Sequence, residues 1–379
     1  MAYTFFDLEK YLDSLLVKLD VPGFDCKITH KGKEVFRHGA GYADRENKKP
    51  ITDKTQYFVY SCSKPITAAA ALHAFEEGYF ILNEPIWHYL PEFRHMKVKD
   101  QNGGTVDTSR DITIQDLFTM GAGFNYDLKA PNVLEAVKRT GGKAPTREII
   151  RSLSEAPLEF QPGELFGYSL CHDVLACLVE VATGTRFADY VKKTVFDPLG
   201  MKHSFYHMND EAKKNMASLY VHDENLKSNL RELKNDYILG DEYDSGGAGI
   251  ITTLDDYSKF AAALASFGTS PDGVKILSKS TVNLMRTNLL FGNRLASFQC
   301  WASNSEYGYG YGVRTKIGEG WGGSICSIGE FGWDGAAGSL LSIDPEREIS
   351  IVYMQHVLNP RLELYHPTIR NLAVLALGY

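Results

Sequence analysis

The sequence predicts an α/β (α+β) fold, with one sheet assembled from both ends of the chain and a helical subdomain inserted between them. Two observations support this fold class. Segments typical of strands occur near the N-terminus and over the last third of the chain, whereas the middle has apolar residues at helical spacing. We therefore expect a sheet domain over residues 1–59 and 240–379, and a helical subdomain over residues 60–239.

The N-terminal segment predicts a helix followed by a β-hairpin. Residues 8–19 have helical apolar spacing and end at the turn sequence VPG, and residues 24–43 alternate around the turn HKGK. From Pro65 to about Asn235 helical patterns dominate, and several of them close on a glycine suited to a helix C-cap. These patterns are ITAAAALHAFEEG, TIQDLFTMG, TREIIRSLSEA, CHDVLACLVEVATG and FADYVKKTVFDPLG. We expect this middle part to be nearly all helix.

The C-terminal segment returns to strands. After the helical run within GGAGIITTLDDYSKFAAALASFG, four segments are expected to be successive strands, and the chain closes with a helix. The strand segments are YGYGYGV, SICSIGEFGW, GSLLSID and EISIVYMQH, and the closing helix is PTIRNLAVLALGY. Strands at both chain ends therefore point to a single sheet.

Composition excludes several classes of protein. The 379 residues carry a net charge of -7, with no basic cluster, so nucleic acid is not an expected partner. No long apolar run and no leader pattern at the N-terminus is apparent, so we expect a cytoplasmic protein without a membrane partner. No CxxC pair occurs, so we expect six reduced thiols: Cys26, Cys62, Cys171, Cys177, Cys300 and Cys326.

The stretch FVYSCSKPITAAAALHAFEEG places a serine and a lysine three residues apart at a predicted helix start. Ser61 and Lys64 would share one helical face, and Pro65 fits only the first turn. The positive end of the helix dipole and partial burial both disfavour an ammonium, so the pKa of Lys64 should be lowered. A neutral lysine can take the proton of Ser61, which makes Ser61 a candidate nucleophile. SxxK alone is a weak signal, since it arises by chance about once or twice in a chain of this length.

Other catalytic templates are missing from the sequence. It contains neither a GxSxG elbow nor an HExxH zinc helix, and none of its 11 histidines falls in a recognisable metal or triad pattern. We therefore expect no metal and no cofactor.

A second segment, FQPGELFGYS, carries a tyrosine directly before a helical run. Together with VPGFDCKITHKGKEVFRHGAGYAD, SCSKP, ILNEPIWHYLPEF, ITIQDLFTMGAG, FDPLGM, GGAGIITTLDDYSKFA and FGWDGAAGSLLSIDP, it makes almost the whole chain resemble one family. That family is the serine β-lactamases and penicillin-binding proteins, in particular the class C-like β-lactamases and family VIII-type esterases. The resemblance implies a β-lactamase-like fold, an antiparallel sheet flanked by helices plus an all-helical subdomain, with the active site between them.

The resemblance assigns roles to individual residues. It implies that Ser61 is the acylated nucleophile, Lys64 its proton-transfer partner and Tyr168 the tyrosine that opens the YxN or YSx motif. We expect the charge of Lys64 to lower the pKa of Tyr168, so that the phenol can relay a proton. The resemblance also places Gly335 on the strand bordering the site, and the backbone amides of Ser61 and Ala336 in an oxyanion hole.

Two departures from the β-lactamase pattern bear on the substrate. Leu170 replaces an asparagine, and Trp333 and Asp334 replace a lysine and a threonine. Asp334 would repel the carboxylate of a β-lactam, so efficient penicillin hydrolysis is not expected. Met120, Tyr126, Leu170, Trp333, Asp334 and Gly335 are the predicted substrate-binding residues.

The sequence thus favours a carboxylesterase that acts on small neutral or apolar acyl substrates. Three alternatives stay open: a β-lactamase or a peptidase for D-amino-acid or other small peptides, an acyltransferase, and a catalytically silent penicillin-binding-like sensor. The only expected partner is a small-molecule acyl substrate, and the sequence leaves the oligomeric state open.

Overall fold

A computed structural model describes residues 3–302, 305–319 and 322–379, and its largest element is an eight-stranded sheet. The strand order is β10-β11-β12-β13-β14-β1-β2-β3, and every neighbouring pair is antiparallel. Its strands are β1 (Gly23–His30), β2 (Lys33–Asp44), β3 (Lys49–Pro50), β10 (Tyr307–Tyr309), β11 (Arg314–Lys316), β12 (Phe331–Asp334), β13 (Leu340–Asp344) and β14 (Ile349–Met354). The sheet is thus built from both ends of the chain, as the sequence predicts.

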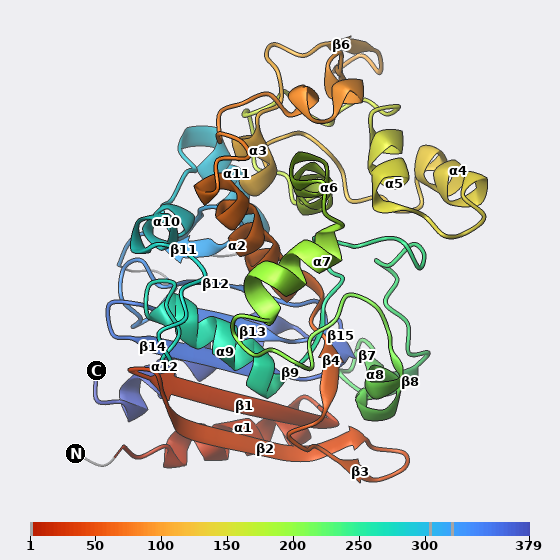
Figure 1. Ribbon diagram of the computed structural model, residues 1–379. Coiled ribbons are helices and arrows are strands. Elements are labelled where there is room, and N and C mark those ends of the chain that lie inside the picture. The colour runs from red at the N-terminus through yellow and green to blue at the C-terminus, as the bar shows by residue number, and fades with distance from the viewer. Residues whose placement is uncertain (1–2, 303–304, 320–321) are drawn as a thin grey trace.

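Both faces of the central strands of the sheet are buried. Alternate residues of these strands point to opposite sides, so each strand contributes to two cores. On β14, Ile351 and Tyr353 join one core with helices α1 (Phe6–Lys18) and α12 (His366–Ala376). Val352 and Met354 join a second core with α9 (Leu254–Ala265). Figure 1 shows α1 at the base of the molecule with β1 and β2. It shows α9 above β1 and below α7. The sheet therefore separates two hydrophobic cores.

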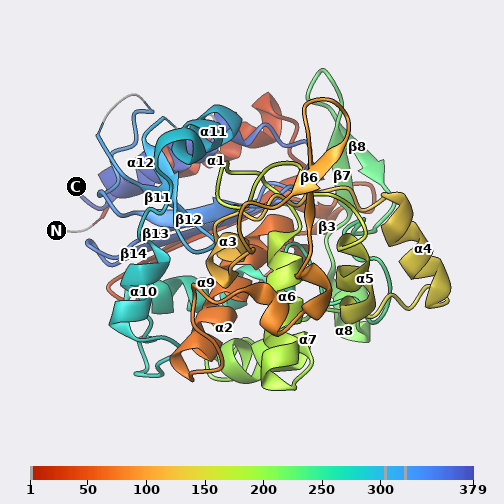
Figure 2. The same ribbon diagram turned by 90° about the horizontal axis from the view of Figure 1, so that it is seen from above.

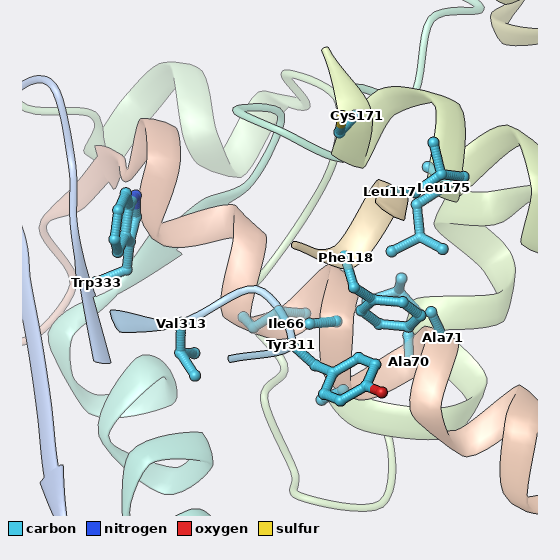
Figure 3. Close-up of a cluster of buried hydrophobic side chains, with 14 of the residues drawn as sticks. Ile66, Ala70, Ala71, Leu117, Phe118, Cys171, Leu175, Tyr311, Val313 and Trp333 are labelled. Carbon is cyan, nitrogen blue, oxygen red and sulfur yellow. The ribbon is translucent and has the colours of Figure 1, made fainter. Parts of the chain in front are cut away.

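The middle of the chain forms the helices above α9, and also α8, which lies at about the level of α9 (Figure 1). These helices are α2 (Ser63–Glu76), α3 (Ile114–Phe118), α4 (Pro131–Arg139), α5 (Thr146–Leu153), α6 (Cys171–Thr183), α7 (Phe187–Val191) and α8 (Asp210–Asn215). Helix α2 is the central one, and all but three of its residues are buried. Figure 3 shows Ile66, Ala70 and Ala71 of α2 beside Phe118 of α3 and Leu175 of α6. Figure 2 shows α4 and α5 at one edge of the molecule and both termini at the opposite edge.

Local sequence signals explain where several helices begin and end. Thr113 and Asp116 form a capping box at the start of α3, and Thr253 caps α9 through the backbone N–H of Asp256. Helix α6 ends at Gly184, whose φ of 66° is the left-handed conformation that glycine adopts readily. Helices α10 (Lys279–Met285) and α11 (Gly292–Ala302) complete the α-helices that the structure describes.

The middle of the chain is less uniformly helical than the sequence predicts. It contains two antiparallel pairs, β5 (Lys97–Lys99) with β6 (Thr105–Asp107), and β7 (Leu219–His222) with β8 (Ser228–Arg231). Strand β15 (Val357–Leu358) joins β7 in parallel. These strands are short and mostly polar on their exposed faces, so they lack the alternation that marks a strand in sequence. The domain boundaries at residues 59/60 and 239/240 stay a prediction.

Three further sequence expectations can be compared with the structure. Within the described ranges, none of the helices is both long and apolar enough to cross a membrane. All six cysteines are free thiols. The segment SICSIGEFGW forms a strand only over its last residues, where β12 begins at Phe331.

Candidate active site

Ser61 lies in a one-turn 3-10 helix, η1 (Tyr60–Cys62), between strand β4 (Gln56–Phe58) and α2. The preceding residue, Tyr60, has a φ of 45°, a conformation that a bulky residue adopts only when its surroundings impose it. The surroundings here are hydrogen bonds on both sides of Ser61. Ser339 Oγ donates to the Val59 carbonyl at 3.1 Å, and Tyr257 Oη donates to the Cys62 carbonyl at 2.7 Å. The serine is thus held on a fixed turn at the start of the central helix.

Lys64 is fully buried one turn after Ser61. Its Nζ lies 3.3 Å from Ser61 Oγ and 3.3 Å from the Tyr126 hydroxyl, and it donates to the carbonyl oxygen of Gly247 at 2.9 Å. Burial lowers the pKa of Lys64 to about 7, and the opposing charge of Asp173 limits the fall. This agrees with the expected lowered pKa, with burial as its largest cause. A large fraction of Lys64 is therefore neutral near pH 7.

Tyr168 lies next to Lys64. The Lys64 Nζ lies 4.6 Å from the centre of the Tyr168 ring, and Trp333 Nε1 donates to the Tyr168 hydroxyl at 3.1 Å. Burial raises the pKa of Tyr168, although its hydrogen bonds with Ser61 and Trp333 favour the phenolate. Our expectation of a lowered pKa is therefore wrong, because removal from water outweighs these two hydrogen bonds. Tyr168 rests as a neutral phenol.

The end of β12 lies against the serine turn. A Cβ on Gly335 would lie 2.0 Å from Ser339 Oγ and 2.5 Å from the Val59 carbonyl oxygen, so only glycine fits there. Gly335 donates its own N–H to the Ser339 carbonyl at 2.8 Å. The next N–H, that of Ala336, has no hydrogen-bond acceptor within the described part of the chain. This N–H is the one that the sequence assigns to an oxyanion hole.

A cavity of about 1130 Å³ opens beside Ser61. Four of the predicted substrate-binding residues line it, and so does Ala336: these four are Tyr126, Trp333, Asp334 and Gly335. Tyr168 stacks between Tyr126 and Trp333, with ring centres 5.6 Å and 5.7 Å away. One wall of the cavity is therefore a continuous aromatic stack.

The structure does not bring Met120 and Leu170 to this cavity. Both are buried among the hydrophobic core side chains, and neither lines the cavity. Leu170 is the N-cap residue of α6, and its backbone pairs with Asn125. Their apolar side chains pack inside the helical part, and nearness in sequence to Tyr168 or Tyr126 does not place them in the site.

Asp334 differs from its expected role as a free negative charge. Its Oδ2 accepts a hydrogen bond from Arg314 at 2.6 Å, and its Oδ1 lies 2.9 Å from His366 Nδ1. Burial would raise the pKa of Asp334, but the Arg314 guanidinium and His366 hold it well below its usual range. The expected repulsion of an anionic substrate is therefore largely offset by the buried Arg314.

Sequence reasoning missed several residues of the site. Tyr237 lines the cavity and packs edge-on against Tyr126, whose hydroxyl also contacts Lys64. Gly247 supplies the carbonyl that accepts a hydrogen bond from Lys64, and Asp173 is the opposing charge with the largest effect on the Lys64 pKa. One signal was present: Asp173 is the acid in the first turn of the otherwise apolar segment CHDVLACLVEVATG. Figure 3 shows Cys171 at the start of this helix.

The arrangement suits nucleophilic attack on an acyl carbonyl. A serine hydroxyl, a neutral amine and a neutral phenol lie in mutual contact, with a backbone N–H nearby for a developing oxyanion. Across the described ranges, the acidic, histidine and cysteine side chains form no group of three or more that could hold a metal ion.

Comparison with known proteins identifies the family. The family model described as Beta-lactamase matches residues 8–375. The chain belongs to the β-lactamase family. Among the relatives of this family member, protein Rv1367c of Mycobacterium tuberculosis is 29% identical over 334 residues, covering 83% of this chain and 81% of that protein. Esterase EstB of Burkholderia gladioli is 33% identical over 202 residues, covering 52% of this chain and 50% of EstB.

Solved structures agree with the β-lactamase fold. The structure of EstCE1, described as a hydrolase with promiscuous acyltransferase activity, has a TM-score of 0.79 and 24% identity. It covers 96% of this chain, and this chain covers 97% of EstCE1. At 24% identity, this structural similarity shows that the two proteins share a fold. The chain therefore has the β-lactamase-like fold with an antiparallel sheet and helices, and belongs to a family of serine hydrolases.

Proposed function

We propose that this protein is a carboxylesterase that forms an acyl-enzyme on Ser61 and acts on small neutral or apolar acyl substrates. One observation carries the proposal: Ser61 Oγ lies 3.3 Å from the buried Nζ of Lys64, whose pKa burial lowers to about 7. A buried amine of this kind is a base matched to neutral pH.

The proposed reaction begins with the attack of Ser61 Oγ on the acyl carbonyl. The proton of the hydroxyl passes to Lys64, either directly or through Tyr168, which contacts both groups. The carbonyl oxygen becomes an oxyanion that the N–H groups of Ser61 and Ala336 stabilise. The proton then moves to the leaving alkoxide, and water repeats the sequence to release the acid.

Two properties of the cavity and one comparison favour a neutral ester. Tyr126, Tyr168 and Trp333 form an aromatic wall next to Ser61, which suits an apolar acyl or alcohol group. The Arg314 guanidinium is already bonded to the Asp334 carboxylate, so it is not free to bind a β-lactam carboxylate. The name of EstB, a relative with 33% identity, points to the same reaction class.

Acyl transfer to an acceptor other than water is the second candidate. Its specific support is the description of EstCE1 as a hydrolase with promiscuous acyltransferase activity. A cavity of about 1130 Å³ can hold an acyl group and an acceptor alcohol together. Partition of an acyl-enzyme between water and added alcohols measures this activity directly. A constant ratio of acid to total product at rising alcohol concentration would reject it.

The decisive test is intact mass after mixing with esters, a penicillin and a D-alanyl peptide. We expect the mass of an acyl group on the wild type with the esters, and none on Ser61→Ala. Ser63→Ala is the matched control, because Ser63 is the neighbouring serine and its Oγ accepts a backbone hydrogen bond from Ile250. Acylation by the penicillin or the peptide alone would favour those alternatives, and none with any compound would favour the silent sensor.

A further inference from the structure

Asp173 is a fully buried carboxylate in the first turn of α6. Its Oδ1 accepts hydrogen bonds from the Tyr243 hydroxyl at 2.9 Å and from Ser245 Oγ at 2.8 Å. Its Oδ2 accepts no side-chain hydrogen bond among the described residues, and the backbone N–H of Gly247 helps to stabilise the carboxylate. A buried carboxylate oxygen with so few donors costs free energy, so its position calls for an explanation.

Asp173 Oδ2 and Lys64 Nζ both lie beside Gly247. A Cβ on this glycine would lie 2.6 Å from Asp173 Oδ2, 3.2 Å from the Tyr126 hydroxyl and 3.3 Å from Lys64 Nζ, so the carboxylate and the amine share a small space next to the glycine. The Gly247 carbonyl accepts the hydrogen bond from Lys64 at 2.9 Å. Thr67 Oγ1 fixes the adjacent Gly246 carbonyl at 2.7 Å, so α2 and α6 both hold this loop.

We propose that Asp173 is a positioning residue that acts on the reaction through Lys64. Its carboxylate fixes the loop that carries Gly247, and it supplies the negative charge beside which Lys64 takes up and releases its proton. This inference rests on the proposed function, since it concerns the proton transfer from Ser61.

The other titratable side chains that face Lys64 carry no charge near neutral pH. Burial raises the pKa of the Cys62 and Cys171 thiols to about 12, and it lowers the pKa of His172 to about 3. Burial also raises the pKa of Tyr126 and Tyr168. Burial raises the pKa of Asp173 too, but the charge of Lys64 opposes that rise. Asp173 is thus the group that can balance an ammonium at Lys64.

This balance matters in the step that forms the acyl-enzyme. Ser61 Oγ bonds to the acyl carbon as its proton moves to Lys64 Nζ, which turns a neutral amine into a buried ammonium. The same proton leaves when the alkoxide departs. Without the Asp173 charge, Lys64 would be a weaker base, and the attack of Ser61 would lose driving force.

The test is the pH dependence of Ser61 phosphonylation by a fluorophosphonate probe, which needs no knowledge of the natural substrate. We compare the wild type with Asp173→Asn, whose amide keeps an oxygen for Tyr243 and Ser245. Removing an anion that lies close to an amine lowers the amine pKa by about one unit or more. The acidic limb of the rate profile should therefore move to lower pH by about one unit or more, and the plateau should fall.

Asp256→Asn is the matched control. Asp256 is another buried aspartate, with hydrogen bonds from the His203 N–H at 2.6 Å and Lys259 Nζ at 2.7 Å, and it lies on α9 outside the cavity lining. It should lower thermal stability and leave the limb in place. If Asp173→Asn does not fold, Asp173→Ser removes the same charge from a smaller side chain.

The outcomes are distinct. A folded Asp173 variant with an unshifted limb would overturn this inference and leave the proposed function standing. A wild type that the probe does not label at Ser61 would overturn both. A shift in Asp256→Asn equal to that in Asp173→Asn would show a general effect of lost stability and would also overturn the inference.

Discussion

The activity of the wild type should fall steeply between pH 7 and pH 5. Burial lowers the pKa of Lys64 from 10.5 to about 7, and only the neutral amine can take the proton of Ser61. About half of Lys64 is then neutral at pH 7 and about 1% at pH 5. The value of kcat/KM for a neutral ester should therefore fall by about fiftyfold over this range.

The sign of this effect follows from the direction of the pKa shift. Protonation below pH 7 removes the active base, whereas an unshifted lysine would leave only about 0.03% neutral amine at pH 7. The assay is hydrolysis of p-nitrophenyl acetate followed at the isosbestic wavelength of the product, with circular dichroism at each pH to monitor folding. A flat profile from pH 5 to pH 7 with the fold intact would refute the role of neutral Lys64. A limb centred near pH 4 would point to a carboxylate base.

Three further changes have expected outcomes. Tyr168→Phe should lower kcat by about 10²- to 10⁴-fold with little change in KM, because it removes the proton relay but keeps the ring. Steady-state kinetics on the same ester measures this change. A retained kcat would exclude the relay. Gly335→Ala should destabilise the protein by about 1–3 kcal/mol in urea unfolding and should lower activity, because its Cβ would lie 2.5 Å from the Val59 carbonyl oxygen. An unchanged midpoint of urea unfolding would contradict this packing. Ile66→Ala should lower stability by about 2–5 kcal/mol, because Ile66 is fully buried. It should leave unchanged the pH at which activity falls.

Residues that are close in sequence were the most predictable part of the site. Ser61 and Lys64 meet because helical geometry brings positions three apart together, and Pro65 marks the helix start. The sheet was predictable because segments with strand periodicity lie at both chain ends, although β10 and β11 are only three residues long. The family resemblance then located Tyr168 and Gly335, which no local rule connects to Ser61.

Contacts that depend on the folded chain were not predictable. Burial, not sequence, decides that the pKa of Tyr168 rises. Met120 and Leu170 are apolar residues near catalytic motifs in the sequence, but their side chains pack in the hydrophobic core. The pairing of Asp334 with Arg314 joins neighbouring strands, and the approach of Asp173 to Lys64 joins two helices across Gly247. These contacts are set by the tertiary arrangement, which pattern and spacing do not encode.

The central claim is that the Ser61 hydroxyl carries the acyl group. Rapid acid quenching during ester turnover, followed by proteolysis and tandem mass spectrometry, locates that group to a single residue. We expect the acyl mass on the Ser61 side chain, at an occupancy that rises when acylation outpaces hydrolysis. An acyl group on any other residue, or turnover without an adduct together with full activity in Ser61→Ala, would contradict the account.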